Sequence, residues 1–311
     1  MRVLIGYQDD DECSRAAVDD LSRAGLGNAE VEARVMSVAP LTSLASDADI
    51  EQRYPALAWL TRERQQFADA QAAAAADHGA QRLRALMPGW NVEAVNVAGT
   101  AHRELIDTAE RWPADLLVIG SHRRGVLGRL FHGSVAQMCV NYSRRSVRIA
   151  RPRPAAAGSA PAPMRLVVAV DDSPMGDVTL RQVASRHWPA GSRAWVIHVV
   201  DSQWVPQAMG ADPEQVLSAA QLGTARQELL ERGRELVQEA AQVLATTGLQ
   251  VTPVVTEGRP RYAINELVER ESADCVFLGA VGHRLMERLV LGSVASAVAA
   301  GAPCSVEVVR P

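Results

Sequence analysis

The chain has 311 residues, about twice the commonest domain size, which predicts two domains that each bury a core of their own. Its net charge of −4 and pI near 6.0 provide no overall attraction to nucleic acid or to an anionic membrane. All 32 basic residues are arginine, so the sequence excludes a Walker-type phosphate loop, a Schiff-base lysine and a lysine general base.

The chain enters a strand-like run directly at Met1-Arg-Val-Leu-Ile-Gly6, without a signal-peptide pattern, and no stretch is long and apolar enough to span a bilayer. We therefore expect a cytoplasmic protein. Four cysteines stand isolated, without a Cys-x-x-Cys pair: Cys13, Cys139, Cys275 and Cys304. We expect them to be buried free thiols rather than redox or metal-binding residues.

In the first half, short apolar runs alternate with stretches of helical spacing. Strands are expected near residues 2–7, 31–38 (ended by Pro40), 91–97, 115–120 and 146–150, and helices near 13–21, 56–86 and 102–111. The helix at 56–86 is rich in Ala, Gln and Arg, and an interruption is expected near His78-Gly79. The alternation predicts a parallel sheet with right-handed crossovers, whose ligands lie beyond the carboxyl ends of the strands.

A segment rich in Pro, Ala and Gly at residues 152–163 has no periodicity and predicts an extended linker. The plan of the first half then repeats, because residues 279–294 align with 120–135 without a gap. Strands are expected near 165–170, 193–200, 251–255, 273–278 and 305–309, and helices near 213–246 (with Leu229, Leu236, Val237, Ala240 and Leu244 on one face) and 294–300. A repeat of about 160 residues is too long for a solenoid. The sequence therefore predicts a duplicated domain, at residues 1–151 and 164–311.

The most informative segment joins the strand at 273–278 to the helix at 294–300 through the spacing Gly279-x2-Gly282-x9-Gly292-Ser293. Ser293 suits the N-cap of that helix, and Gly301 its end. The free N–H groups and the positive dipole end of a helix N-terminus hold anions, and glycine lets the main chain approach them. The segment therefore predicts a phosphate cradle, with ordinary turn chemistry as the alternative.

This spacing resembles the pattern of ATP-binding members of the universal stress protein family, and the closing strand near residues 302–310 resembles theirs. The resemblance covers nearly the whole chain. It implies an α/β fold of two tandem Rossmann-like (adenine nucleotide alpha hydrolase-like) domains, each a five-stranded parallel sheet with helices on both faces. Single-domain members of that family commonly dimerise through the last strand, so the resemblance implies an intrachain pseudo-dimer, with a homodimer as a further option.

The resemblance also implies ATP as the ligand, with Mg²⁺ accompanying its phosphates. The implied nucleotide-binding residues are Ala169, Asp171, Val199, Gly258, Gly279, Gly282, His283, Arg284, Gly292, Ser293 and Val294. In the family the aspartate lies at the base and ribose end of the nucleotide, where a carboxylate accepts bonds from ribose hydroxyls, and the valine backbone meets adenine. The alternatives are that Asp171 and Ser173 only cap the following helix, and that His283 and Arg284 belong to a solvated loop.

The first half departs from this pattern at two positions. Gln8 stands in place of the aspartate and Arg123 in place of the second glycine. Its remaining candidate residues are Val38, Gly99, Gly120, Gly133 and Ser134. We expect this first site to bind nucleotide more weakly or not at all.

Together with the phosphate cradle, the resemblance implies a cytoplasmic ATP-binding regulatory protein of the stress response, acting through conformation or an unknown protein partner, without nucleic acid or membrane. No dedicated general base or nucleophile is identifiable, so any ATP hydrolysis is expected to be slow. An ATPase or nucleotidyl-transfer enzyme using Asp171, Asp172 or Glu257 is one alternative. An interaction protein that binds no nucleotide is the other.

Overall fold

The computed structural model describes residues 1–27, 30–41, 54–121, 134–152, 162–201, 219–282 and 291–311. The chain forms two compact units, one of Met1–Ser22 with Leu26–Ala155 and one of Arg23–Gly25 with Ala156–Pro311. Within the described ranges, no helix combines the length and the apolar composition that crossing a membrane requires. Residues 153–161 of the expected linker lie outside these ranges.

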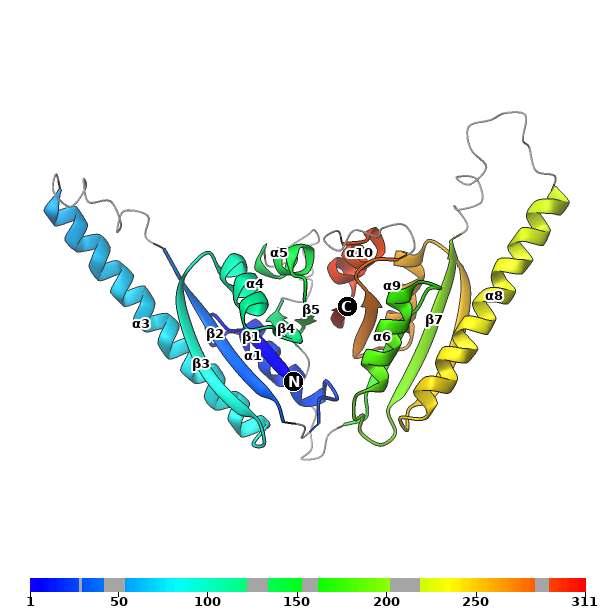
Figure 1. Ribbon diagram of the computed structural model, residues 1–311, viewed down its shortest axis with the longest axis horizontal. Helices are drawn as coiled ribbons and strands as arrows, with labels where there is room; N and C mark the ends of the chain where they lie inside the picture. The colour runs from blue at the N-terminus through cyan, green and yellow to red at the C-terminus, as the bar shows by residue number, and fades with distance from the viewer. Residues whose placement is uncertain (28–29, 42–53, 122–133, 153–161, 202–218, 283–290) are drawn as a thin grey trace. The chain divides into compact units, whose positions relative to one another are not determined.

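The first unit contains five parallel strands in the order β3-β2-β1-β4-β5 (Figure 1). Its elements in chain order are β1 (Arg2–Gly6), α1 (Glu12–Asp19), the 3-10 helix η1 (Asp20–Arg23), β2 (Glu32–Pro40), α3 (Pro55–Leu86), β3 (Asn91–Gly99), α4 (Ala101–Arg111), β4 (Leu116–Gly120), α5 (Ser134–Tyr142) and β5 (Ser146–Ala150). α1 packs against α3, and α4 against α5. The helices therefore cover the sheet in two pairs.

The second unit repeats this plan with the strand order β8-β7-β6-β9-β10, again all parallel. Its elements are β6 (Arg165–Ala169), α6 (Pro174–Ala184), β7 (Arg193–Asp201), α8 (Ala219–Ala245), β8 (Gln250–Gly258), α9 (Pro260–Arg270), β9 (Cys275–Gly279), α10 (Ser293–Gly301) and β10 (Ser305–Val309). α6 packs against α8, and α9 against α10. Both units are thus Rossmann-like α/β domains.

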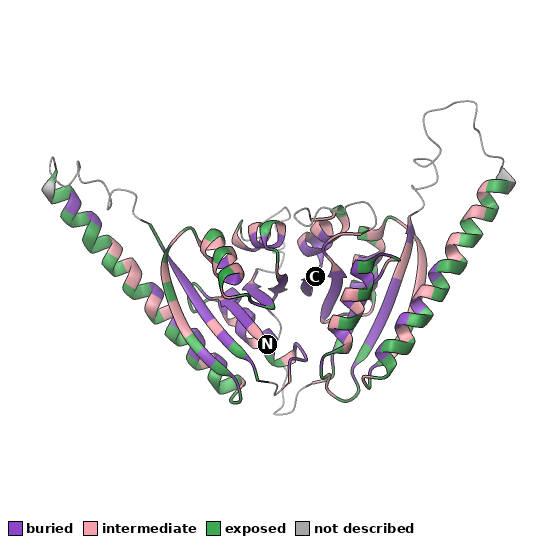
Figure 2. Cartoon of the chain, viewed as in Figure 1, coloured by how far each residue is buried: buried purple, intermediate pink, exposed green. Residues whose placement is uncertain are grey.

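The central strands are apolar because both faces of each sheet are covered. In β1 and β4 of the first unit, and in β6 and β9 of the second, the interior residues are fully or almost fully buried. Figure 2 shows buried strands and helices whose outer faces are exposed. All four cysteines are buried thiols outside any disulfide, as expected from their isolation.

The expected strands are present, with differences at their ends. β2 continues through Pro40, where the sequence analysis expected it to have stopped, because its pairing with β3 extends to Pro40 opposite Gly99. β8 likewise runs on to Gly258. The helix expected at 213–246 is observed as Ala219–Ala245, and residues 213–218 lie outside the described ranges.

The expected interruption of the helix at His78-Gly79 is wrong, because α3 is continuous from Pro55 to Leu86. Gly79 is a contact point rather than a break. A Cβ atom built on Gly79 would lie 2.8 Å from the ring of Tyr7 and 2.9 Å from Cγ1 of Val35. The glycine therefore lets the helix lie directly on the buried tyrosine ring.

We expect Gly79→Ala to destabilise the protein by about 1–2 kcal/mol, since overpacking costs about 1–3 kcal/mol while alanine gains up to about 1 kcal/mol in helix propensity. Gly223 in α8 is the matched control, because a Cβ there would meet nothing within 4 Å. Gly223→Ala is expected to stabilise by about 1 kcal/mol. Urea unfolding followed by circular dichroism measures both, and equal effects of the two substitutions would contradict this account of Gly79.

Each unit buries a charged pair at the corresponding place, with opposite polarity. In the first unit Arg148 on β5 donates from Nε to Oδ2 of Asp20, which follows α1, at 2.5 Å. In the second unit the polarity is reversed, because Glu307 on β10 accepts from Arg186, which follows α6. These four side chains are at most 4% exposed. A buried charge persists only with a close partner, so each pair joins the last strand of its unit to the end of the first helix region.

Candidate nucleotide-binding site

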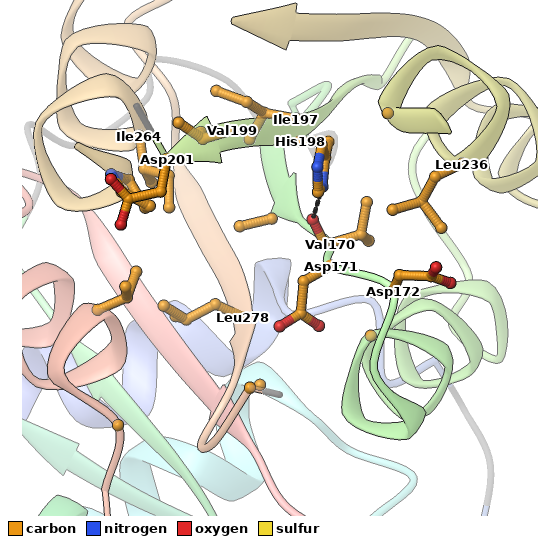
Figure 3. Close-up of a pocket in the computed structure, with 18 of the residues that line it drawn as sticks. Val170, Asp171, Asp172, Ile197, His198, Val199, Asp201, Leu236, Ile264 and Leu278 are labelled. Carbon is orange, nitrogen blue, oxygen red and sulfur yellow. Dashed lines mark hydrogen bonds between the residues drawn. The ribbon is translucent and has the colours of Figure 1, made fainter. Parts of the chain in front are cut away.

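A cavity of about 650 Å³ lies at the carboxyl edge of the second unit's sheet (Figure 3). It is lined by the ends of β6, β7 and β9, the N-termini of α9 and α10, and one face of α8: Ala169, Val170, Asp171, Asp172, Gly176, Ile197, His198, Val199, Val200, Asp201, Leu229, Arg232, Gly233, Leu236, Pro260, Ile264, Leu278, Gly279, Ala280, Val281, Gly282, Gly292, Ser293, Val294 and Ala295. The cavity size falls within the usual range for small-molecule sites.

The topology of the sheet explains the position of this cavity. The chain passes from β6 to β7 on one side and returns to β9 on the other side of β6. The crossovers therefore leave in opposite directions at β6, which opens a crevice beyond the carboxyl ends of the strands.

Asp171 extends into the cavity from the loop after β6, whereas the neighbouring Asp172 points in a different direction (Figure 3). The hydroxyl of Ser173 donates to Oδ1 of Asp171. Ser173 is also the N-cap of α6, where its Oγ accepts from the backbone N–H of Gly176 at 3.3 Å. Of the two residues that the sequence offered as caps, Ser173 makes the capping bond, and Asp171 is held by Ser173.

The cavity's glycines have different steric neighbours. A Cβ on Gly279 would lie 2.9 Å from Cγ of Met175, so packing against α6 already requires glycine there. A Cβ on Gly282 would instead lie 2.5 Å from Oδ2 of Asp171. Gly292 donates its N–H to the carbonyl of Ala280 at 2.7 Å, which closes the turn onto the end of β9.

The N-terminus of α10 differs from the expectation by one residue. Gly292, with φ −63° and ψ 151°, is the N-cap, and Ser293 is the first helical residue, without a side-chain capping bond. The first bond of the helix runs from the N–H of Ser296 to the carbonyl of Gly292. The N–H groups of Ser293, Val294 and Ala295 therefore have no partner within the helix, as at any helix N-terminus. All three residues line the cavity.

The wall formed by α8 was missed by the sequence analysis. Leu229, Arg232 and Leu236 all line the cavity, and their spacing of three and four residues places them on one helix face. Leu229 and Leu236 were expected to share one face of the helix, and the spacing of Arg232 from these two leucines could have placed it on the same face. The sequence analysis also left out His198 and Asp201, which extend the polar lining.

Two arginines of α8 form ion pairs, and one of them, Arg232, lines the cavity. Arg232 donates to both carboxylate oxygens of Asp172, at 3.0 and 3.2 Å, and Arg226 donates to both oxygens of Glu257, at 2.6 Å each. The hydrogen bonds from Arg226 hold the pKa of Glu257 below its usual value. The bonds to Asp172 and Glu235 raise the pKa of Arg232. Of the lining carboxylates, Asp172 is thus committed to a guanidinium group, whereas Asp171 accepts from the hydroxyl of Ser173.

His198 packs beneath α8 at the cavity wall. Its Nδ1 lies 3.1 Å from the carbonyl oxygen of Val170, so the tautomer that carries the proton on Nδ1 donates to that oxygen. A Cβ on Gly233 would lie 2.8 Å from Cδ2 of the ring. Glycine at this position therefore lets α8 approach the histidine closely.

Eight of the predicted residues line the cavity together: Ala169, Asp171, Val199, Gly279, Gly282, Gly292, Ser293 and Val294. Gly258 lies at the end of β8 and is not among the lining residues. Its φ of +143° favours glycine for backbone reasons alone. His283 and Arg284 lie outside the described residues. Among the described residues, no group of three or more His, Cys, Asp or Glu side chains is placed so that it could hold a metal ion.

The corresponding region of the first unit is occupied by different side chains. Tyr7, at the position of Val170, is 1% exposed, and its hydroxyl donates to Oδ1 of Asp10 at 2.9 Å. Asp10 also lies 3.4 Å from Nε2 of His78 on α3 and 3.3 Å from NH1 of Arg15. Burial, followed by the bond to Asp10, raises the pKa of Tyr7. This network ties the loop after β1 to α1 and α3.

The first unit's described candidate residues lie near the ends of β2, β3 and β4 and at the start of α5. Val38 is buried in β2, Gly99 ends β3 beside Glu104, and Ser134 is the first residue of α5. A Cβ on Gly120 would collide with the carbonyl oxygen of Cys13, so packing against α1 requires that glycine. Gly133 and Arg123 lie outside the described residues.

Known proteins resemble this chain in sequence. The model of the "Universal stress protein family" matches residues 1–151 and 163–310. A universal stress protein of Mycolicibacterium smegmatis is 29% identical over 211 residues, covering 67% of this chain and 65% of that protein. One of Methanocaldococcus jannaschii is 34% identical over 82 residues, covering 26% of this chain and 48% of that protein. The matches span about half to two thirds of the length of these curated relatives.

Solved structures share the fold. A universal stress protein from Archaeoglobus fulgidus aligns with a TM-score of 0.61 at 20% identity, covering 99% of this chain and 96% of that one. A protein of unknown function from Pseudomonas aeruginosa aligns with a TM-score of 0.53 at 12% identity, covering 100% of this chain and 92% of that one. At such low identity these likenesses concern the architecture alone.

Proposed function

Because the chain belongs to the universal stress protein family, we propose that its second unit binds ATP and that the protein acts in the stress response as a regulatory protein. It acts through its conformation or through contacts with a protein partner. The observation that carries this proposal is the convergence of Asp171, the glycines Gly279 and Gly282 and the N-terminus of α10 on one cavity. A fold alone would not support a ligand, so the proposal depends on this site.

The chemistry of the cavity suits the three parts of an adenylate. Ile197, Ile264 and Leu278 provide apolar surface for a base, next to the main chain of Val199. Asp171 provides a carboxylate that accepts bonds from ribose hydroxyls. The N–H groups of Ser293 and Val294, at the positive end of α10, suit phosphate oxygens. Mg²⁺ would enter with the phosphates and neutralise part of their charge.

The arginine pairs favour a binding role over rapid catalysis. An ATPase would need a carboxylate as a base, and two of the candidates are Asp172 and Glu257. Each forms a bidentate ion pair with an arginine. A guanidinium partner stabilises the charged carboxylate and makes it a weaker base. We expect any hydrolysis of bound ATP to be slow.

Two measurements separate this proposal from its alternatives. Nucleotide released by denaturing the purified protein and identified by chromatography distinguishes an ATP-binding protein from an interaction protein without nucleotide. Turnover with excess ATP and Mg²⁺ tests the enzymatic alternative, an ATPase or a nucleotidyl transferase. Fast turnover that is lost in Asp171→Ala would favour the enzyme and contradict the regulatory role proposed here.

We expect Asp171→Ala to weaken ATP binding by about tenfold to a hundredfold, since a hydrogen bond to a charged group contributes about 1.5–3 kcal/mol. Isothermal titration calorimetry measures the dissociation constant. Asp177→Ala is the matched control, because Asp177 is an exposed aspartate in the first turn of the neighbouring α6. An unchanged dissociation constant in Asp171→Ala would remove the carboxylate from the proposed site.

For the first unit we propose weaker nucleotide binding or none. Gln8 replaces the aspartate, and the loop after β1 is already engaged through Tyr7, Asp10 and His78. A stoichiometry of one ATP per chain in the same titration would support this proposal, and two equivalent sites would contradict it.

A further inference from the structure

Two residues meet at Asp171, one nearby in the chain and one from the segment after β9. The hydroxyl of Ser173 donates to Oδ1, and the backbone of Gly282 lies on the side of Oδ2, where a Cβ would come within 2.5 Å. We call Asp171, Ser173 and Gly282 the aspartate clamp. Ser173 thus bonds one oxygen of the carboxylate, and an added side chain at Gly282 would collide with the other.

The donor capacity of Ser173 is committed to this contact. A serine hydroxyl has one hydrogen to donate and two lone pairs that accept. The hydrogen goes to Asp171, while a lone pair accepts from the N–H of Gly176 at 3.3 Å. Capping α6 requires only the acceptor, so the donor function of Ser173 serves the aspartate.

Gly282 acts on the same carboxylate from the other side. The carboxylate group is planar and rigid, so a methyl group at residue 282 that displaced Oδ2 would also draw Oδ1 away from Ser173. A rotation of the Asp171 side chain that relieves the contact would also move the oxygen that accepts from Ser173. The size of the side chain at residue 282 and the hydrogen bond from Ser173 are therefore coupled through Asp171.

The first unit differs at all three corresponding positions. Gln8, Asp10 and Arg123 stand where the second unit has Asp171, Ser173 and Gly282. The cap of α1 moves to Asp11, which accepts from the N–H of Ser14 at 2.7 Å. A helix at this place in the fold can therefore be capped without a serine at the position of Ser173, and the three clamp residues are present or absent as a set.

We propose that Ser173 is a positioning residue of the nucleotide site, and that Gly282 is needed for the room that the oriented carboxylate of Asp171 requires. Together the clamp fixes the direction in which Asp171 accepts bonds from ribose hydroxyls. This inference rests on the proposed binding of ATP. It adds to Gly282 a role that is distinct from letting phosphate approach the main chain.

The test compares ATP with 2′,3′-dideoxy-ATP, which lacks both ribose hydroxyls, by calorimetry on the full chain. The wild type is expected to prefer ATP by about tenfold or more, the value of a hydrogen bond to a charged group. Asp171→Ala sets the reference, with a ratio near one. In Ser173→Ala the ratio of the two affinities is expected to fall towards one. In Ser173→Thr the preference for ATP is expected to be retained, because threonine keeps the hydroxyl.

Ser173→Gly separates positioning from capping. Glycine is a tolerated N-cap, but it has no hydroxyl to donate to Asp171. We expect thermal stability close to that of the wild type with a lost preference for ATP. The substitution adds no charge next to Asp171 or the phosphates. A preference retained in both Ser173→Ala and Ser173→Gly would reduce Ser173 to a cap and overturn the inference.

Gly282 is tested by a double-mutant cycle. Gly282→Ala is expected to weaken ATP binding more in the wild-type background than in Asp171→Ala, because without the carboxylate the added methyl group meets no clamp. Equal losses in both backgrounds would mean that Gly282 serves only to let phosphate approach the main chain, and would overturn its place in the clamp. A wild type that binds ATP with no preference over the dideoxy analogue would overturn the clamp while leaving ATP binding intact, whereas a wild type that binds neither would overturn the proposed function itself.

Discussion

We expect Gly292→Val to lose ATP binding by more than about a hundredfold, since at least two bonds from main-chain N–H groups to phosphate, at about 1.5–3 kcal/mol each, would be lost. Gly292 is the N-cap of α10 and lines the cavity directly before Ser293 and Val294. A branched side chain there would occupy the space in which phosphate meets these N–H groups. Calorimetry on the purified variant measures the loss.

The control for this substitution is Gly133→Val, the corresponding position of the first half in the sequence repeat. It is expected to leave ATP binding by the second unit unchanged. Gly292→Ala provides a graded step, because its Cβ would lie 3.2 Å from the carbonyl of Ala280 and require only a small shift. Circular dichroism establishes that each variant is folded. A folded Gly292→Val variant with wild-type affinity would show that α10 does not hold the phosphates.

The second large effect is expected for the buried pair of the second unit. Glu307→Ala should destabilise the protein by about 3–5 kcal/mol, because it removes the carboxylate from a guanidinium that stays buried. Both side chains are at most 3% exposed. Thermal unfolding and urea unfolding measure the change.

Two further variants sharpen this prediction. Replacing both partners with apolar residues, as in Arg186→Met with Glu307→Leu, is expected to recover much of the loss, because neither charge then remains buried. Arg270→Ala is the surface control, since its pair with Glu271 has an arginine side chain that is 59% exposed, and it should cost at most about 1 kcal/mol. A cost for Glu307→Ala as small as that of the control would contradict the importance of the buried pair.

Local sequence patterns predicted the strands of this fold and five of its helices, because alternation, apolar runs and helix stop signals are local properties. No range was predicted for α5, α6 or α9. The errors occurred where a distant residue decides the outcome. Gly79 was expected to interrupt a helix, yet the ring of Tyr7 beneath it explains the glycine without a break. Ser293 was expected to cap α10, yet the bond from Gly292 to Ala280 places the cap one residue earlier.

The candidate site could be predicted in part. The glycine spacing and Asp171 indicated where the strand ends meet, and these residues do line one cavity. The α8 wall could not be read in the same way, because Arg232 and its partner Asp172 are 60 positions apart and neither belongs to a recognisable motif. An arginine on a helix face is equally compatible with a solvated surface.

The amino-acid sequence by itself determined the duplication, the alternation of strands and helices, and the spacing of glycines before a helix N-terminus. Each of these features can be recognised from the residue types and their spacing along the chain. Only the tertiary structure decided which carboxylate stays available in the cavity and which is neutralised. Asp171 is held by Ser173 and Asp172 is paired with Arg232, although the two aspartates are adjacent in the chain. The physical reason is that the ionic and steric surroundings of a side chain depend on what the fold brings next to it.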